Sequence, residues 1–211
     1  MKEKVKEFIV KNFKWIILFI CLIGFLAIAE NVFNKEIMNG DIVGYKLIST
    51  FLISDFATPI AKFITNFGGA IFLTVLTIIL FILIKNKKIG LSIFSNLVII
   101  TALNQLLKNI LQRPRPTEYR IIEETGYSFP SGHSMISMAF YGYIIYLIYK
   151  YVKNKYIKWI SIVLLSILIC SIGISRIYLG VHYTSDVLGG FLISVSYLVI
   201  YISAVIKSFV L

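Results

Sequence analysis

Long apolar runs recur along the chain and are separated by short polar stretches. Each run comes close to the ~20 residues that a helix needs to cross the ~30 Å hydrocarbon layer of a bilayer. The pattern therefore predicts an all-α, polytopic membrane protein built as a bundle of six transmembrane helices. The predicted spans are Trp15 to Ala29 (extendable to Phe33), Gly68 to Ile84, Ile89 to Leu107, Ser134 to Tyr149, Trp159 to Ser175 and Val187 to Ile206.

The first run is compatible with two kinds of segment. Its Lys-rich start and the Ala27-Ile28-Ala29 at its exit are typical of a signal peptide with a small-residue cleavage site. Against cleavage, the run is at the upper length limit of a signal core and resumes at Val32-Phe33. These features favour a retained membrane anchor.

The segment between the first two spans, Ile42 to Phe67, is apolar but interrupted. The interruptions are Lys46, Asp55, Pro59 and Lys62. This pattern suits an interfacial amphipathic helix on the outer side of the membrane better than another crossing, and we expect it to flank a lipid entrance. No internal repeat or soluble domain is visible, so residues 1–211 are predicted to form a single membrane domain.

Composition and charge support a membrane protein and give its orientation. The chain is 58% hydrophobic and 15% charged, with a mean hydropathy of +0.87, which is too apolar for a water-soluble domain. After six crossings both termini share a side, which carries thirteen lysines against Glu3 and Glu7, whereas the opposite side carries eight basic and eight acidic residues. The net charge of +11 thus predicts cytoplasmic termini and the phospholipid bilayer as partner, with no nucleic acid.

Ionisable residues gather at the opposite, extracytoplasmic ends of the predicted spans. A single interfacial histidine is more often an anchor than a functional group, but the only two histidines of the chain lie here together with other charged residues. Charges at such depths are costly unless they pair or serve a site. The group consists of Lys108, Arg115, His133, Arg176, His182 and Asp186.

In the stretch KNILQRPRP, Lys108 is predicted to end the third helix. Pro114 and Pro116 prevent that helix from continuing, so Arg115 is held on a stiff extended turn. Two cations therefore project from one helix end.

In the stretch FPSGHS, Pro130 can occupy the first turn of the fourth helix. The free backbone N–H groups of Ser131, Gly132 and His133 would then face out of its positive end. Gly132 lets an anion approach the backbone closely, so this stretch predicts an anion-binding site.

In the stretch SRIYLGVHYTSD, Arg176 ends the fifth helix, and His182 and Asp186 are four residues apart at the start of the sixth. That spacing stacks them on one helix face, where the carboxylate can bind one imidazole nitrogen and leave the other free to attack. Three cations and a helix N-terminus match the charge that develops during phosphoryl transfer. One histidine could attack phosphorus while the other protonates the leaving oxygen.

These residues also carry a family resemblance. Lys108-x6-Arg115-Pro116, Pro130-Ser131-Gly132-His133 and Ser175-Arg176-x5-His182-x3-Asp186 resemble the three signature motifs of the type 2 phosphatidic acid phosphatase family, whose active site is similar to that of vanadium haloperoxidases. The resemblance implies His182 as the nucleophile that forms a phosphohistidine, Asp186 as its orienting group and His133 as general acid. It implies no metal and no other cofactor. The phosphate ligands that it implies are Lys108, Arg115, Ser131, Gly132 and Arg176.

The resemblance predicts an enzyme that hydrolyses the terminal phosphate of a membrane lipid phosphate or diphosphate at the outer face. The compact, Lys-rich chain is similar to bacterial members that act on undecaprenyl diphosphate or phosphatidylglycerophosphate, and we prefer the polyprenyl diphosphate. A lipid phosphotransferase is the alternative within enzymes. A non-catalytic lipid or ion transporter is the alternative from another class, although no charged residue lies in the middle of the six runs.

Other polar residues near the motifs are expected to have simpler roles. Arg113 and Arg120 lie outside the motif positions, so lipid headgroups or solvent are their expected contacts. Glu118, Glu123 and Glu124 are expected at a solvated loop edge, because carboxylates beside a phosphate site would repel the substrate. The pair Gly189-Gly190 is expected to let two helices approach closely.

Overall fold

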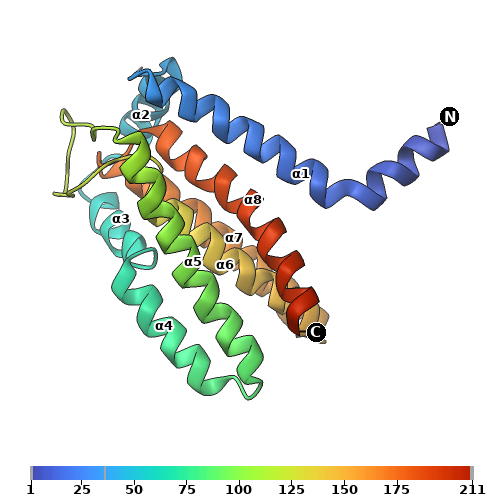
Figure 1. The fold of residues 1–211 in the computed structure, drawn as a ribbon. Coiled ribbons are helices and arrows are strands. Elements are labelled where there is room, and N and C mark those ends of the chain that lie inside the picture. The colour runs from blue at the N-terminus through green and yellow to red at the C-terminus, as the bar shows by residue number, and fades with distance from the viewer. Residues whose placement is uncertain (1, 36, 210–211) are drawn as a thin grey trace.

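The computed structural model describes residues 2–35 and 37–209, which form eight helices and no strand (Figure 1). The all-α prediction is therefore confirmed for the described part of the chain. The helices are α1 (Lys2–Phe33), α2 (Asn39–Leu52), α3 (Ala57–Asn66), α4 (Ala70–Leu83), α5 (Lys87–Leu111), α6 (Gly132–Tyr151), α7 (Lys155–Tyr178) and α8 (Thr184–Phe209).

Four helical segments among the described residues are long and apolar enough to cross a membrane. They are Asn12–Phe33, Lys87–Leu111, Lys155–Tyr178 and Thr184–Val205. The pair α3 and α4, bent by 49°, adds a fifth crossing if it forms one broken span. Helix α6, the predicted fourth span, is not among them, because its many Ser, Gly and Tyr residues lower its hydropathy. The number of six spans stays a prediction.

The segment between the first two predicted spans contains two helices where the sequence suggested one. Helix α2 ends at Leu52, and α3 begins at Ala57 and leads through Gly68 and Gly69 into α4. The predicted second span is therefore only the 14-residue α4, and part of the expected interfacial helix extends it. Only α2 is left as a separate helix outside the candidate spans in this segment.

The bundle is centred on α6, which packs against α5, α7 and α8. Its aromatic residues Phe140 and Tyr143 are buried in the largest core cluster together with Ile172 of α7. Helix α8 approaches the start of α6 so closely that a Cβ atom on Gly190 would lie 3.2 Å from the nitrogen of Met135. The expected close approach at the glycine pair is thus confirmed, and it fixes the start of α6 beside the first turns of α8.

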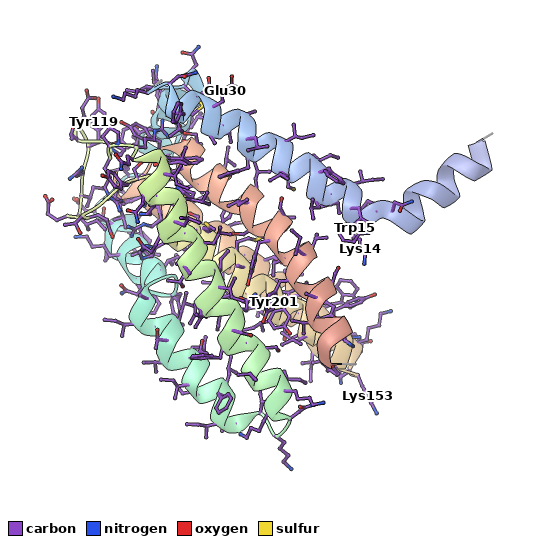
Figure 2. The ribbon with its side chains drawn as sticks, viewed as in Figure 1. Lys14, Trp15, Glu30, Tyr119, Lys153 and Tyr201 are labelled. Atoms are coloured by element: carbon purple, nitrogen blue, oxygen red, sulfur yellow. The ribbon has the colours of Figure 1, made fainter. Side chains whose placement is uncertain are left out.

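The two ends of the bundle differ in character. Both chain termini lie at one end, whereas α2 and the long 112–131 loop lie at the other (Figure 1). Lys14 and Lys153 lie toward the end that holds the termini, and Glu30 and Tyr119 lie toward the loop end (Figure 2). The predicted site residues are all placed at or near the loop end.

Candidate active site

The three motif segments converge where the 112–131 loop crosses the end of the bundle. Lys108 lies in the last turn of α5, which ends with Gln112 in a left-handed conformation (φ 44°) before the two prolines. Its ammonium group donates a hydrogen bond to the carbonyl of Tyr127 at 2.6 Å. Arg176 lies in the last turn of α7. The predicted positions of both cations at helix ends are confirmed.

His182 lies in the turn before α8 and not on the helix itself. Helix α8 begins at Thr184, so the expected stacking of His182 and Asp186 on one helix face is wrong. The contact between them forms all the same, because Nδ1 of His182 lies 3.3 Å from Oδ2 of Asp186. Both side chains are buried, with 1% and 0% of their surfaces exposed.

Arg115 fixes the second nitrogen of the same imidazole. Its Nη1 lies 3.0 Å from the carbonyl of Val181 and 3.1 Å from Nε2 of His182. Its other nitrogens donate to the carbonyls of Thr125 and Gly126. Since a guanidinium can only donate, Nε2 must accept, and the ring proton therefore lies on Nδ1, facing Asp186. This tautomer places the imidazole lone pair on Nε2.

The surroundings of His182 keep its ring neutral. Burial lowers the pKa of His182 from 6.5 to about 4, and the hydrogen bond and charge of Asp186 oppose this shift only in part. At neutral pH the Nε2 lone pair is thus not occupied by a proton. A neutral imidazole with a fixed tautomer is the form that can act as a nucleophile.

Glu124 contradicts its predicted place at a solvated loop edge. Its carboxylate accepts a hydrogen bond from Nη2 of Arg176 at 2.5 Å, while Nη1 of Arg176 donates to the hydroxyl of Thr65 at 2.8 Å. Burial acts to raise the pKa of Glu124, but the charge and hydrogen bond of Arg176 outweigh it, so this pKa lies below its ordinary value. The prediction considered only the repulsion between a carboxylate and a phosphate. It left out that the buried cation Arg176 needs an anionic partner when no phosphate is bound.

The start of α6 offers fewer free donors than the sequence suggested. The helix begins at Gly132 with Ser131 as its N-cap, so Pro130 precedes the helix instead of occupying its first turn. The backbone N–H of Ser131 donates to the carbonyl of Asp186 at 3.0 Å and is not free. The N–H groups of Gly132 and His133 occupy the first turn, where a helix leaves its donors available.

His133 lies within the electrostatic influence of the other site residues. Its imidazole interacts with the charges of Arg176, Glu124 and Lys108, and it lies near the imidazole of His182. The two histidines, which come from opposite sides of the α6–α8 contact, therefore belong to one cluster. All the residues predicted for the site are brought to this end of the bundle.

Arg113 contradicts its predicted contact with headgroups or solvent. Its side chain is 5% exposed and lies between the carboxylates of Asp41 and Asp186, 2.7 Å from each. The repeated Arg-Pro in residues 113–116 was the available signal, because it places both arginines on the same stiff turn. Nothing in the sequence pattern linked Asp41, 72 residues away, to this arginine.

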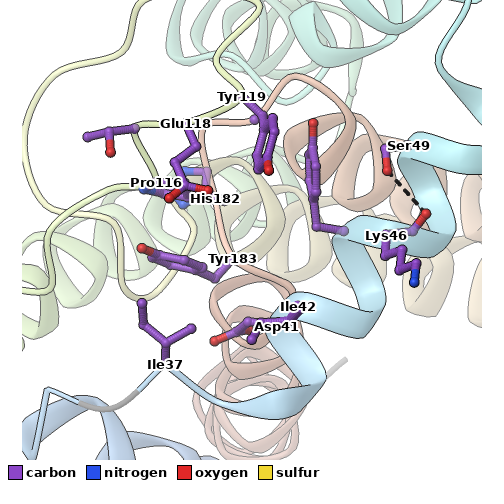
Figure 3. A pocket seen from close by; sticks show the side chains of 13 residues that line it. Ile37, Asp41, Ile42, Lys46, Ser49, Pro116, Glu118, Tyr119, His182 and Tyr183 are labelled. Carbon is purple, nitrogen blue, oxygen red and sulfur yellow. Dashed lines mark hydrogen bonds between the residues drawn. The ribbon is translucent and has the colours of Figure 1, made fainter.

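A cavity of about 700 Å³ opens beside His182, between α2 and the 116–119 segment (Figure 3). Its walls include Ile37, Ile42 and Tyr45 on one side and Pro116 and Tyr119 of the loop on another. The cavity reaches the charged residues of the site at His182.

The described residues contain no group of three or more His, Cys, Asp or Glu side chains that could hold a metal ion. The positive charges near His182 are instead side chains of the protein. Lys108, Arg113, Arg115 and Arg176 provide them.

Comparison with known proteins places these residues in a family. A model of the PAP2 superfamily matches residues 89–209, which is more than half of the chain. The chain belongs to the PAP2 superfamily, and its named relatives are phosphatases, which indicates a hydrolase.

Two curated relatives and one solved structure illustrate the similarity. The chain is 40% identical over 90 residues to phosphatidylglycerophosphatase B of Bacillus subtilis, a match that spans 42% of this chain and only 44% of that protein. It is 27% identical over 195 residues to undecaprenyl-diphosphatase of Sulfolobus acidocaldarius, over 87% and 86% of the two chains. The crystal structure of a transmembrane PAP2 type phosphatidylglycerolphosphate phosphatase from Bacillus subtilis matches with a TM-score of 0.80 at 27% identity, covering 90% of this chain and 96% of that one.

The depressed pKa of His182 predicts a pH-dependent stability. Between pH 6.5 and about pH 4, His182 binds a proton in the unfolded chain but not in the folded protein. The free energy of unfolding therefore has its full value above pH 6.5 and decreases as the pH falls toward 4. Thermal unfolding in detergent should show a smaller decrease of Tm between pH 6.5 and 4 for His182→Gln than for the parent. Parallel curves for the two proteins in this window would contradict the assignment of a neutral buried imidazole.

Proposed function

We propose that the protein is an integral membrane lipid phosphatase, formed by residues 1–211 as a single domain, that removes the terminal phosphate from a lipid phosphate or diphosphate. The observation that carries the proposal is the state of His182: a buried neutral imidazole with its lone pair on Nε2, held by Asp186 at Nδ1 and surrounded by cations. Such an imidazole can accept a phosphoryl group, and the cations neutralise the charge of that group.

Two lipids are the leading substrate candidates. The names of the two curated relatives support phosphatidylglycerophosphate and undecaprenyl diphosphate. The cavity beside His182 supports a lipid in general, because Ile37, Ile42 and Tyr45 make part of its wall apolar, next to the charged Asp41, Lys46 and Glu118. A panel of both lipids, offered to the purified protein in detergent, separates the candidates by kcat/KM for phosphate release.

Phosphate binding requires the resting contacts of the site to change partners. Arg115 now bonds His182, and Arg176 now bonds Glu124. The charged oxygens of an incoming phosphate can accept strong, paired hydrogen bonds from each arginine. When Arg115 turns to the phosphate, Nε2 of His182 is free to attack. Lys108, the hydroxyl of Ser131 and the N–H groups of Gly132 and His133 complete the proposed set of ligands, with no metal or cofactor.

In the first chemical step, the Nε2 lone pair of His182 forms a bond to phosphorus while the bond from phosphorus to the lipid oxygen breaks. His133 enters this step protonated, because the negative charge of the bound phosphate stabilises its imidazolium, and it gives this proton to the oxygen as it leaves. Asp186 stabilises the imidazolium that His182 becomes, since the Nδ1 proton already faces its carboxylate. The product of this step is a phosphohistidine and a free lipid alcohol or lipid monophosphate.

In the second step, water attacks the phosphohistidine. His133, now neutral, takes a proton from the water as the bond from oxygen to phosphorus forms and the bond from phosphorus to Nε2 breaks. Inorganic phosphate leaves, Nε2 recovers its lone pair, and Arg115 can return to it. If a lipid hydroxyl replaced the water, the same residues would carry out the phosphotransfer.

The proposed enzyme crosses the membrane six times, with both termini in the cytoplasm and the site at the extracytoplasmic face. The supporting observations are the excess of lysines on the terminal side of the sequence and the position of both termini opposite the 112–131 loop. The sixth crossing is assigned to α6, which is not among the helices that are long and apolar enough to span a membrane by themselves. Its buried position between α5, α7 and α8 supports that crossing.

Topology can be tested with single cysteines in a background from which Cys21 and Cys170 have been removed. Glu123 has a side chain that is 92% exposed on the loop side, and Lys153 is exposed in the turn between α6 and α7. An impermeant thiol reagent applied to intact cells should label Glu123→Cys and spare Lys153→Cys until the cells are opened. The reverse pattern would place the site in the cytoplasm.

The cation cluster predicts that activity does not depend on a divalent metal. Turnover should be unchanged by a chelator and inhibited by vanadate, which adopts the five-coordinate geometry of the transferred phosphoryl group. The measurement is phosphate release from a lipid phosphate in detergent, with and without EDTA. Loss of activity with EDTA and recovery with Mg²⁺ would contradict the proposed mechanism.

The proposed roles of the two histidines predict that their substitutions affect lipid and aryl substrates differently. His182→Ala should abolish turnover and any acid-labile phosphoenzyme, whereas Asp186→Asn should leave a weak remnant of each. His133→Ala should cost about 10²–10⁴-fold with a lipid substrate and much less with an aryl phosphate, whose leaving group departs without a proton.

The quantity that decides is the ratio of aryl phosphate to lipid phosphate turnover, measured for each variant relative to the parent. The ratio should rise for His133→Ala. If it rises for His182→Ala instead, the acid and the nucleophile are exchanged.

A further inference from the structure

A buried network of ions, formed by Asp186 and two residues outside the family motifs, joins α2 to the start of α8. Nη1 of Arg113 lies 2.7 Å from Oδ1 of Asp186, and Nη2 lies 2.7 Å from Oδ2 of Asp41. The three side chains are 5%, 0% and 1% exposed. One guanidinium thus bridges two carboxylates that are shielded from water.

Arg113 makes an ionised Asp186 possible at this place. A fully buried carboxylate takes up a proton unless hydrogen bonds and an opposite charge compensate it. Oδ2 of Asp186 accepts from the hydroxyl of Ser128 at 2.6 Å and from the backbone N–H of Tyr183 at 2.9 Å, in addition to its contact with His182. At Oδ1, Arg113 supplies a full positive charge.

Asp41 in turn fixes Arg113. Its Oδ2 accepts from Arg113, and its Oδ1 accepts from the backbone N–H of Ser185 at 2.8 Å. The guanidinium is also held from its flat side, because its carbon lies 4.1 Å from the ring centre of Tyr183. Asp41 is therefore joined both to the cation and to the first turn of α8.

Helix α2 packs closely against the first residue of α8, which makes this arrangement rigid. Gly44, one turn after Asp41, packs directly on the side chain of Thr184, and a Cβ atom there would overlap it. The same helix lines the cavity beside His182 with Ile42 and Tyr45 (Figure 3). Docking of α2 is thus linked through Asp41 to the residues that hold the imidazole.

The geometry points to Asp41 and Arg113 as positioning residues of the active site: Arg113 keeps Asp186 ionised, and Asp41 holds Arg113 in place, so that α2 completes the His182–Asp186 pair. This inference rests on the proposed role of His182 as nucleophile. Neither residue touches the phosphate.

The first test is Arg113→Met, which keeps much of the length of the side chain and removes its charge. Two carboxylates would then share a buried space without a cation, so a proton is taken up by His182 or Asp186. A proton on His182 occupies the attacking lone pair of Nε2, and a proton on Asp186 removes the charge that stabilises the imidazolium formed in the first step. We expect kcat for an aryl phosphate to fall about 100-fold, with KM within about twofold of the parent. The acid limb of the kcat–pH profile should move to higher pH.

The decisive test is the double variant Asp41→Asn/Arg113→Met. Removing the second negative charge relieves the imbalance that Arg113→Met creates, so the double variant should have a higher kcat than Arg113→Met alone, and its acid limb should return toward that of the parent. Asp41→Asn alone should lower kcat by about 10-fold and should not move the acid limb upward. Residues that only support the fold would give a double variant as poor as, or poorer than, either single one.

Arg120→Met is the matched control. Arg120 lies in the same loop, but its contacts are the carbonyl of Pro116 and the carboxylate of Glu123. This variant should keep the acid limb of the parent. If Arg113→Met does not fold, as judged by Tm and gel filtration in detergent, Asp41→Asn decides, and a kcat and KM equal to those of the parent overturn the inference.

Failure of this inference can be distinguished from failure of the proposed function. If His182→Ala abolishes the phosphoenzyme while Arg113→Met retains the parent kcat and pH profile, the role of Arg113 and Asp41 is wrong and the mechanism stands. If His182→Ala still forms a phosphoenzyme, the proposed mechanism itself is wrong.

Discussion

A charge buried at the end of an apolar bundle must find its partner inside the protein, and this constraint organises the whole site. Asp186 shows it most clearly, since its carboxylate is 0% exposed and receives contacts from Arg113, Ser128, Tyr183 and His182. The contacts come from two structural features: the 112–131 loop supplies two, and the turn before α8 supplies the other two. The path of the loop across the bundle follows from these contacts.

The resting site is complete without substrate, because its cations bond protein acceptors. Arg115 uses His182 and backbone carbonyls, and Arg176 uses Glu124 and Thr65. Each buried cation thus has a protein partner before the phosphate arrives. In the proposed mechanism the phosphate must displace Glu124 from Arg176 and Arg115 from Nε2. Binding and activation of the nucleophile are then the same event.

The sequence allowed the local features of the site to be predicted, but not its long-range pairings. Lys108 and Arg176 lie in last helical turns as expected, because prolines and the apolar pattern mark helix ends well. The pairs Arg113–Asp41 and Arg176–Glu124 join residues 72 and 52 positions apart, and no periodicity encodes such contacts. His182 was misplaced by two residues, since the spacing of four that fits a helix face also fits a turn followed by a first helical turn.

The limits of the fold prediction have a similar cause. The helical class follows from apolar runs, and the break between α3 and α4 at Gly68 and Gly69 lies at the predicted boundary between the interfacial segment and the second span. The break between α2 and α3, at residues 53–56, lies inside the segment that the sequence suggested was one helix. Helix α6 is surrounded by other helices, so it can carry Ser, Gly and Tyr in place of lipid-facing apolar residues. The hydropathy of a helix reflects its contact with lipid, and α6 has little contact with lipid because other helices surround it.

The central claim is that Nε2 of His182 is the atom that receives the phosphoryl group. A crystal structure of the protein with orthovanadate tests it most directly, because vanadate forms a bond to the attacking atom in the geometry of the transition state. The account predicts vanadium bonded to Nε2 of His182, with Arg115 turned from that nitrogen to the vanadate oxygens and Arg176 released from Glu124. Vanadium bonded to His133, or held through a divalent metal ion, would contradict it.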